Sequence, residues 1–364
     1  MTRPWIRGPL WDGVCVLSGL PIGLMLVLLT APWYDWPNPQ HYQNSLPLLL
    51  FFSATVSLET GHALAPIVLA WSHGGFRQIV LEHKPRYILL PTLIIMGSVL
   101  IGGITSLGIT DYRPGPHQMF QIDSWRNPFP IMVWVYILWN AYHFGMQNFG
   151  VLSIYRRKWE ELTLLKRQRE GSGADLELES VSDTKPEVRA WDQRQIDKIF
   201  CLVMTCIPMA TAFPISLLHN MNLRAPCVTL SLIATGGMLL RDFKRGISLP
   251  RLVFILTNGL ALALIWWQSI IGFAVYSLNH WLVAIGLSSH VYSVRWHWAF
   301  VLTMLLVGAV GFFWLIPTAN GALLRVIPVF VSARLGLGFA HFLYDRWLWK
   351  MTDPRVRAAI AAIY

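Results

Sequence analysis

Long apolar stretches recur along almost the whole chain, separated by short segments that contain charges, Pro, Gly or Asn. Most are about 18 to 26 residues long, and a helix of that length crosses the roughly 30 Å of hydrocarbon in a bilayer. They lie at residues 13–31, 46–71, 87–108, 129–153, 197–218, 226–240, 252–274, 276–293, 298–316 and 322–345. The pattern predicts an all-α fold, a polytopic transmembrane helical bundle of about ten spans.

Positive charges are concentrated in alternate loops. These basic residues follow every second span: Arg77, Lys84, Arg86, Arg156, Arg157, Lys158, Arg241, Lys244, Arg245, Arg346 and Lys350. Because loops rich in Lys and Arg remain in the cytoplasm, both termini are predicted to be cytoplasmic. The protein is accordingly expected in the cell membrane, as a multi-pass protein surrounded by the lipid bilayer.

The composition excludes several other classes of protein. Hydrophobic residues make up 54% of the 364 residues and charged residues only 13%, against about 25% charged in soluble domains. A soluble, disordered or disulfide-stapled protein is therefore not expected. The net charge of +10 is spread over short loops and forms no single patch, so no nucleic-acid partner is predicted.

One segment, residues 156–194, has a mixed-charge composition and contains a Gly-Ser-Gly tract. It is predicted to be a flexible cytoplasmic loop. This loop would divide the chain into an N-terminal transmembrane bundle of about four spans (1–155) and a C-terminal bundle of about six (195–364). It is either a plain solvated linker or the docking site of a protein partner.

The candidate chemistry lies in four histidines on four different predicted spans: His62, His143, His290 and His341. All are placed in the cytoplasmic half, on helices that run in the same direction, with a scatter in depth of about 9 Å. Ionisable side chains are costly in hydrocarbon, and helix bundles build sites for iron, copper or zinc from facing imidazoles. The set predicts a metal site with open positions for oxygen or substrate. The alternative is that each histidine is a hydrogen-bonded packing residue.

Three of these histidines have a polar neighbour on the same helix face. These are Glu59, three residues before His62, Gln147, four after His143, and Asp345, four after His341. Glu59 and Asp345 are predicted to act as ligand, orienting group or proton relay, and Gln147 as a supporting group.

Two further features leave alternatives open. Arg334 lies at nearly the same predicted depth as Glu59, so the two either form an ion pair or leave Glu59 to the metal. Trp266 and Trp267 lie deeper in the chain's predicted spans than most of its tryptophans. They either line a substrate cavity or pack between helices.

The histidine spacings narrow the choice of cofactor. Neither H-x-x-x-H nor H-x-x-H-H occurs, so a membrane di-iron desaturase is not expected, and the C-x-x-C-H of covalent haem attachment is absent as well. Haem b held between two facing histidines needs no local motif and is left as an alternative to a bare metal ion.

The stretch Ala141-Tyr142-His143-Phe144-Gly145 resembles the Brp/Blh family of membrane-embedded β-carotene 15,15'-dioxygenases, and Gly61-His62-Ala63 partly matches that family's earlier histidine motif. The resemblance implies an all-helical membrane protein that holds Fe(II) with histidines. It also implies cleavage of a carotenoid's central double bond by O2 to give retinal. Under this resemblance His143 is an iron ligand and His62 a second one.

The chain departs from the family at two places. Ala65 and Pro66 follow the first motif where the family has an acidic residue, and His280, His290 and His341 are widely spaced where the family has two histidines one turn apart. These departures leave the substrate more open than the metal. His280 is set aside because it lies about 15 Å from His290 along one helix.

Together these features predict a non-haem Fe(II) oxygenase that takes an apolar, carotenoid-like substrate from the bilayer and uses O2. One alternative is a proton-coupled transporter, with the same histidines, Glu59 and Arg334 as its relay. Another is a non-catalytic subunit or assembly factor of a membrane complex, docked through the 156–194 loop.

Overall fold

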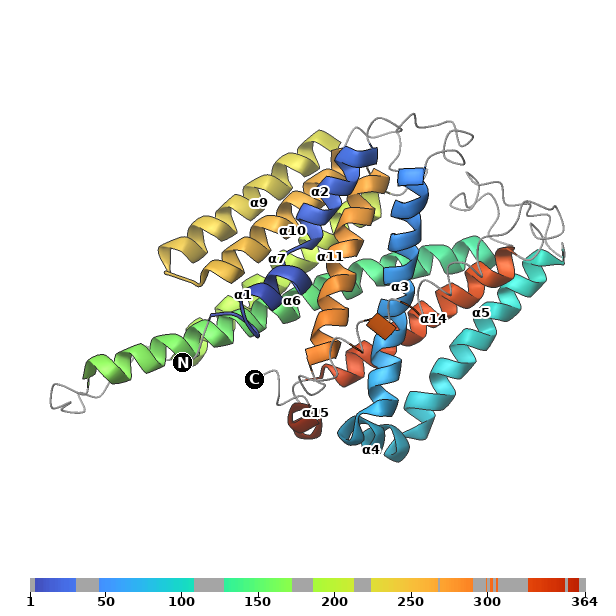
Figure 1. Cartoon of the computed structure of the whole chain (residues 1–364), viewed down its shortest axis with the longest axis horizontal. Helices are drawn as coiled ribbons and strands as arrows, with labels where there is room; N and C mark the ends of the chain where they lie inside the picture. The colour runs from blue at the N-terminus through green and yellow to red at the C-terminus, as the bar shows by residue number, and fades with distance from the viewer. Residues whose placement is uncertain are drawn as a thin grey trace.

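The computed structural model describes residues 4–30, 46–107, 128–171, 186–212, 224–267, 269–290, 327–350 and 353–359, together with a few isolated positions near 300. The regular structure in these ranges is helical throughout, which confirms the predicted all-α class (Figure 1). The helices are α1 (Pro9–Cys15), α2 (Gly19–Thr30), α3 (Leu46–Ser72), α4 (Gly74–Glu82), a π-helical turn (Pro85–Leu89) continued by α5 (Leu90–Ser106), α6 (Pro128–Gly171), α7 (Pro186–Ala212), α9 (Arg224–Lys244), α10 (Leu249–Trp267), α11 (Ser269–His290), α14 (Ile327–Leu348) and α15 (Pro354–Ala359).

The predicted apolar stretches correspond to helices wherever the structure describes them. The first is interrupted between α1 and α2, and the stretch 252–274 runs across the junction between α10 and α11. The stretch 298–316 lies almost wholly outside the described residues. Within the described ranges, one helical stretch, Pro85–Ser106, is both long and apolar enough to cross a bilayer, with a mean hydropathy of 2.2 over its best window. Helices such as α6 also carry inward-facing Asn140, His143 and Asn148, which lower their mean hydropathy. The number of spans stays a prediction.

The predicted flexible loop at 156–194 requires a correction. Helix α6 continues to Gly171 and α7 already begins at Pro186, so both flanks of this segment are helical, while 172–185 lie outside the described residues. Ion pairs one turn apart stabilise the extension of α6: Arg156 with Glu160 at 3.6 Å and Arg157 with Glu161 at 3.4 Å. Mixed charge here therefore marks solvated helix faces.

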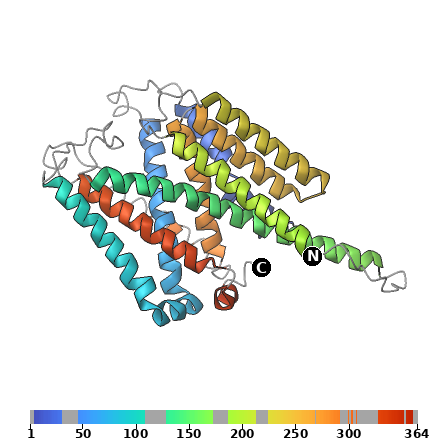
Figure 2. The same ribbon diagram turned by 180° about the vertical axis from the view of Figure 1, so that it is seen from behind.

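Helices from the two ends of the chain pack against each other. Helix α14 packs along α5 and against α3, while α11 packs against α3, α2 and α10, and α6 lies beside α7 (Figure 2). Small residues permit the close approach of α5 and α14. A Cβ at Gly102 would lie 2.5 Å from the carbonyl oxygen of Pro328, and one at Gly336 would lie 2.9 Å from Cβ of Ser98. Gly103, next in the sequence, has nothing within 4 Å of such a Cβ, so the close approach is confined to one face of α5.

A fully buried charge cluster joins α6, α7, α9 and α10. Arg251 donates from Nη1 and Nη2 to the two carboxylate oxygens of Asp197 at 3.0 and 2.7 Å, and from Nε to Asp242 at 2.7 Å. It also donates to the carbonyl oxygen of Leu152 at 3.0 Å. Burial alone would lower the pKa of Arg251, which lies outside the predicted spans, but the hydrogen bonds and charges of Asp197 and Asp242 raise it. The guanidinium therefore stays charged and ties the four helices together.

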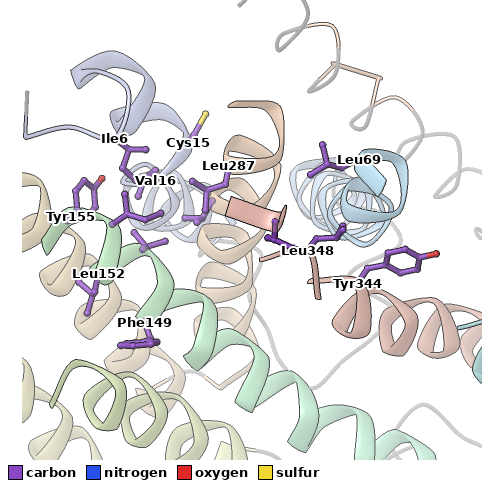
Figure 3. Packing of buried hydrophobic residues seen from close by; sticks show 14 of the residues in the cluster. Ile6, Cys15, Val16, Leu69, Phe149, Leu152, Tyr155, Leu287, Tyr344 and Leu348 are labelled. Atoms are coloured by element: carbon purple, nitrogen blue, oxygen red, sulfur yellow. The ribbon is translucent and has the colours of Figure 1, made fainter. Parts of the chain in front are cut away.

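The main apolar core draws side chains from α3, α6, α11 and α14 as well as from other helices. Leu69 of α3, Leu152 of α6, Leu287 of α11 and Leu348 of α14 belong to this one cluster (Figure 3). We call these four leucines the apolar floor. Because they come from four different helices, they hold those helices in a common register.

Candidate metal centre

Four imidazoles meet in the interior, each from a different helix. They belong to His62 of α3, His143 of α6, His280 of α11 and His341 of α14, and at most 8% of any of these residues is exposed. Two turns further along, three of the helices contribute to the apolar floor: Leu69 follows His62, Leu287 follows His280 and Leu348 follows His341. The histidines therefore share one level, on helices that run in the same direction through it.

The ring nitrogens of this histidine cluster are close enough to bind one ion. Nε2 of His280 lies 3.1 Å from Nε2 of His62, and Nε2 of His341 lies 3.3 Å from Nε2 of His143. Two nitrogens each about 2.1 Å from a metal are about 3.0 Å apart at a right angle and about 3.4 Å apart at a tetrahedral angle. Both observed separations fall in this interval. They also match a hydrogen bond between two neutral rings, the arrangement that the same pairs would adopt without an ion.

A carboxylate adds a further donor to the cluster. Oδ2 of Asp345, which is 12% exposed, lies 3.5 Å from Nε2 of both His143 and His341. Two groups of three ligand atoms each lie within 4.8 Å of one another: His62, His143 and His280, and His143, His341 and Asp345. His143 belongs to both groups, so the two sets of three donors adjoin each other and share one imidazole.

Aromatic rings and one amide hold the imidazoles in place. Phe144 stacks on His280 with ring centroids 3.7 Å apart, and Phe342 packs on His143 at 4.6 Å. Gln147 donates from Nε2 to the carbonyl oxygen of His280 at 3.1 Å and so fixes α11 against α6. Among the described residues, Nδ1 of His280 has no hydrogen-bond partner. Its ring orientation is therefore set by the stacking on Phe144 and by the contact of its Nε2 with His62.

Glu59 and Arg334 lie beside the histidine cluster and form an ion pair with each other. Oε1 of Glu59 lies 2.7 Å from Nη2 of Arg334, and the two side chains are 30% and 17% exposed. Of the two roles predicted for Glu59, the geometry displays the ion pair. Since Glu59 lies one turn before His62, the pair forms a charged layer next to the imidazoles, on the side away from the apolar floor.

The structure brings together four of the predicted site residues, His62, His143, His341 and Asp345, and adds His280. His290 is the last residue of α11 and its side chain lies outside the described residues, as do the side chains of Trp266 and Trp267 at the end of α10. Their predicted roles stay predictions. Ten residues of helix place His290 about 15 Å from His280 along α11.

His280 was missed because the start of its helix was placed too late. The sequence pattern begins the eighth span at residue 276, which puts His280 near its outer end, whereas α11 begins at Ser269. Counted from there, His280 lies about three turns into its helix, and the other three histidines lie about four turns into theirs. The available signal was the apolar run before residue 276, which continues the helix upstream.

The fold and the site together define the class: an all-α protein with a buried histidine cluster that could hold a metal ion. No protein family, characterised protein or solved structure matches the chain. The resemblance around His143 to the Brp/Blh family accordingly stays a prediction, and the chemistry must be argued from the residues themselves.

Proposed function

We propose that the protein is an integral membrane, non-haem Fe(II) oxygenase that acts on an apolar, carotenoid-like substrate dissolved in the bilayer. The observation that carries the proposal is the convergence of four buried imidazoles from four helices. Their Nε2 atoms pair at 3.1 and 3.3 Å, with a carboxylate oxygen 3.5 Å from two of them. Neutral imidazoles with a carboxylate are a donor set used by non-haem iron oxygenases.

The outer surface supports a lipid environment. Apolar side chains on α5 and α9 are between 56% and 65% exposed: Leu93, Met96, Leu100, Leu230 and Ile233. These two helices lie on opposite sides of the molecule in both views (Figures 1 and 2). Water-soluble monomers rarely expose large contiguous apolar patches, so apolar faces on opposite sides favour surrounding lipid. The alternation of basic loops would then place both termini in the cytoplasm.

The crowding of the rings favours a bare ion over haem b. The ring centroids of His62, His143, His280 and His341 lie between 4.1 and 6.1 Å apart in the pairs that contact one another. A porphyrin held between two axial histidines needs a broad flat gap, and the other two rings occupy that space. Iron rather than zinc or copper is proposed because of the resemblance around His143.

Fe(II), when bound, supplies the redox chemistry by which both atoms of O2 are transferred to a carbon–carbon double bond, giving two carbonyl groups with no external reductant. The residues of the chain hold and shield that centre. The apolar floor excludes water on one side, and Gln147 fixes the helix that carries His280. Asp345 supplies a carboxylate oxygen next to His143 and His341, where it can ligate the ion or accept a proton.

The test is metal analysis with an optical spectrum on detergent-purified protein. Wild type is compared with His143→Ala and with His83→Ala, which removes an exposed histidine outside the cluster. About one iron per chain without a Soret band is expected in wild type and in His83→Ala, and a loss of that iron in His143→Ala. A monodisperse, folded wild type that takes up no transition metal would refute the proposal and favour transport or a structural role.

A further inference from the structure

Two hydrogen-bond donors of Arg334 have no acceptor in the part of the chain that the structure describes. It lies on α14 two turns before His341, and its Nη2 is paired with Glu59. Nε and Nη1 are buried, and neither has an acceptor among the residues that the structure describes. Buried N–H groups of a charged side chain are expensive to leave unpaired, so a further acceptor, beyond the described residues, is expected at this position.

The unpaired donors lie next to the proposed iron site. The carboxylate that meets Arg334 belongs to Glu59, one turn before His62, which places the guanidinium roughly one turn, about 5 Å, from the level of the imidazoles. On α6, Tyr136 lies two turns before His143 and is connected to it by Phe342, which stacks on Tyr136 at 5.6 Å and packs on His143 at 4.6 Å. The imidazoles are thus bounded by a polar layer on one side and by the apolar floor on the other.

The charges of Glu59 and Arg334 indicate which kind of group could accept hydrogen bonds from the unpaired donors of Arg334. Glu59 already neutralises Arg334 at 2.7 Å, so an added anion would face the carboxylate of Glu59 as well as the guanidinium. A neutral oxygen accepts hydrogen bonds from Nε and Nη1 without that repulsion. The described geometry therefore fits a hydroxyl or carbonyl oxygen better than a carboxylate.

We propose that Arg334 binds a neutral oxygen of the substrate, so that the substrate is an apolar chain carrying a hydroxyl or carbonyl group rather than a pure hydrocarbon. This inference rests on the proposed function for the location of the substrate. By holding this oxygen, Arg334 would fix the position of the substrate along the site and thereby determine which of its carbon–carbon bonds lies next to the imidazoles.

The test measures binding of one isoprenoid chain that ends in a hydrogen, a hydroxyl, an aldehyde or a carboxylate. Quenching of the protein's 18 tryptophans reports binding without turnover, and the assay is run without oxygen in detergent micelles. Wild type is expected to prefer the hydroxyl and aldehyde over the hydrocarbon by about tenfold. Arg334→Met should remove this preference while keeping the affinity for the hydrocarbon and the iron content. Arg346→Met, an exposed arginine on the same helix, should keep the preference.

A second variant tests the charge argument and stands in if Arg334→Met does not fold. Glu59→Gln removes the counter-charge of Arg334, so the carboxylate probe should become the tightest ligand. Equal affinity of wild type for all end groups would overturn the inference. A loss of iron or of all binding in Arg334→Met would also overturn it, because the role of Arg334 would then be to join α14 to α3. Iron content is measured separately: iron-free wild type contradicts the proposed function, whereas the end-group preference is decided by the binding data.

Discussion

Replacing His280 by alanine tests the one histidine of the cluster that the sequence pattern did not select. The change removes one of four imidazoles, whose Nε2 lies 3.1 Å from that of His62. Losing a group that merely orients a ligand lowers metal affinity by about 10- to 100-fold, so losing a ligand should lower it by at least about 100-fold, or about 2.7 kcal/mol. His290→Ala, on the same helix, should change the affinity by less than about twofold, since ten residues place it about 15 Å further along.

The assay is competition for iron between the protein and a chelator of known affinity. Because His280 also stacks on Phe144 at 3.7 Å, His280→Ala leaves a cavity that free imidazole can fill. Added imidazole should restore part of the iron binding and thereby separate the loss of a ligand from general destabilisation. If His290→Ala releases the iron while His280→Ala retains it, the cluster described here is not the metal site.

Three further changes test the packing around the site. Gly102→Ala should lower the unfolding midpoint in detergent by the equivalent of about 1–3 kcal/mol, because its Cβ would lie 2.5 Å from a backbone oxygen of α14, whereas Gly103→Ala should be neutral or slightly stabilising. Arg251→Met should cost about 3–5 kcal/mol by leaving two buried carboxylates without their partner, and Arg355→Met, in an exposed pair, should change the thermal midpoint little. Gln147→Leu should weaken iron binding about tenfold in the chelator assay, by freeing the helix segment that carries His280; an unchanged affinity would mean that packing alone positions it.

The sequence pattern predicts helix positions well because burial and hydrocarbon both require long apolar runs. It places α3 within a residue at each end and gives the positions of His62, His143 and His341 correctly enough to indicate a shared level. The sequence pattern misplaces helix boundaries where polar residues are buried inside helices. The start of α11 was placed seven residues late, at 276 instead of Ser269, and this shifted the choice from His280 to His290.

The buried charges were beyond the pattern for a different reason. Asp197 and Asp242 flank predicted spans and look like ordinary interface residues in the sequence, but both are fully buried against Arg251. Which carboxylate meets which guanidinium depends on how four helices pack, and helical periodicity carries no information on that pairing. For the same reason the choice between an ion pair and a metal role for Glu59 needed the position of α14.

The order in which the site residues are synthesised limits when the histidine cluster can form. About 280 residues separate His62 from His341, and at roughly 5–20 residues per second their synthesis takes on the order of fifteen seconds to a minute. A chain that stops before α14 lacks His341 and Asp345, and with them one of the two groups of three donors. A metal site that uses all four imidazoles can therefore be completed only late in synthesis, after α14 has been made.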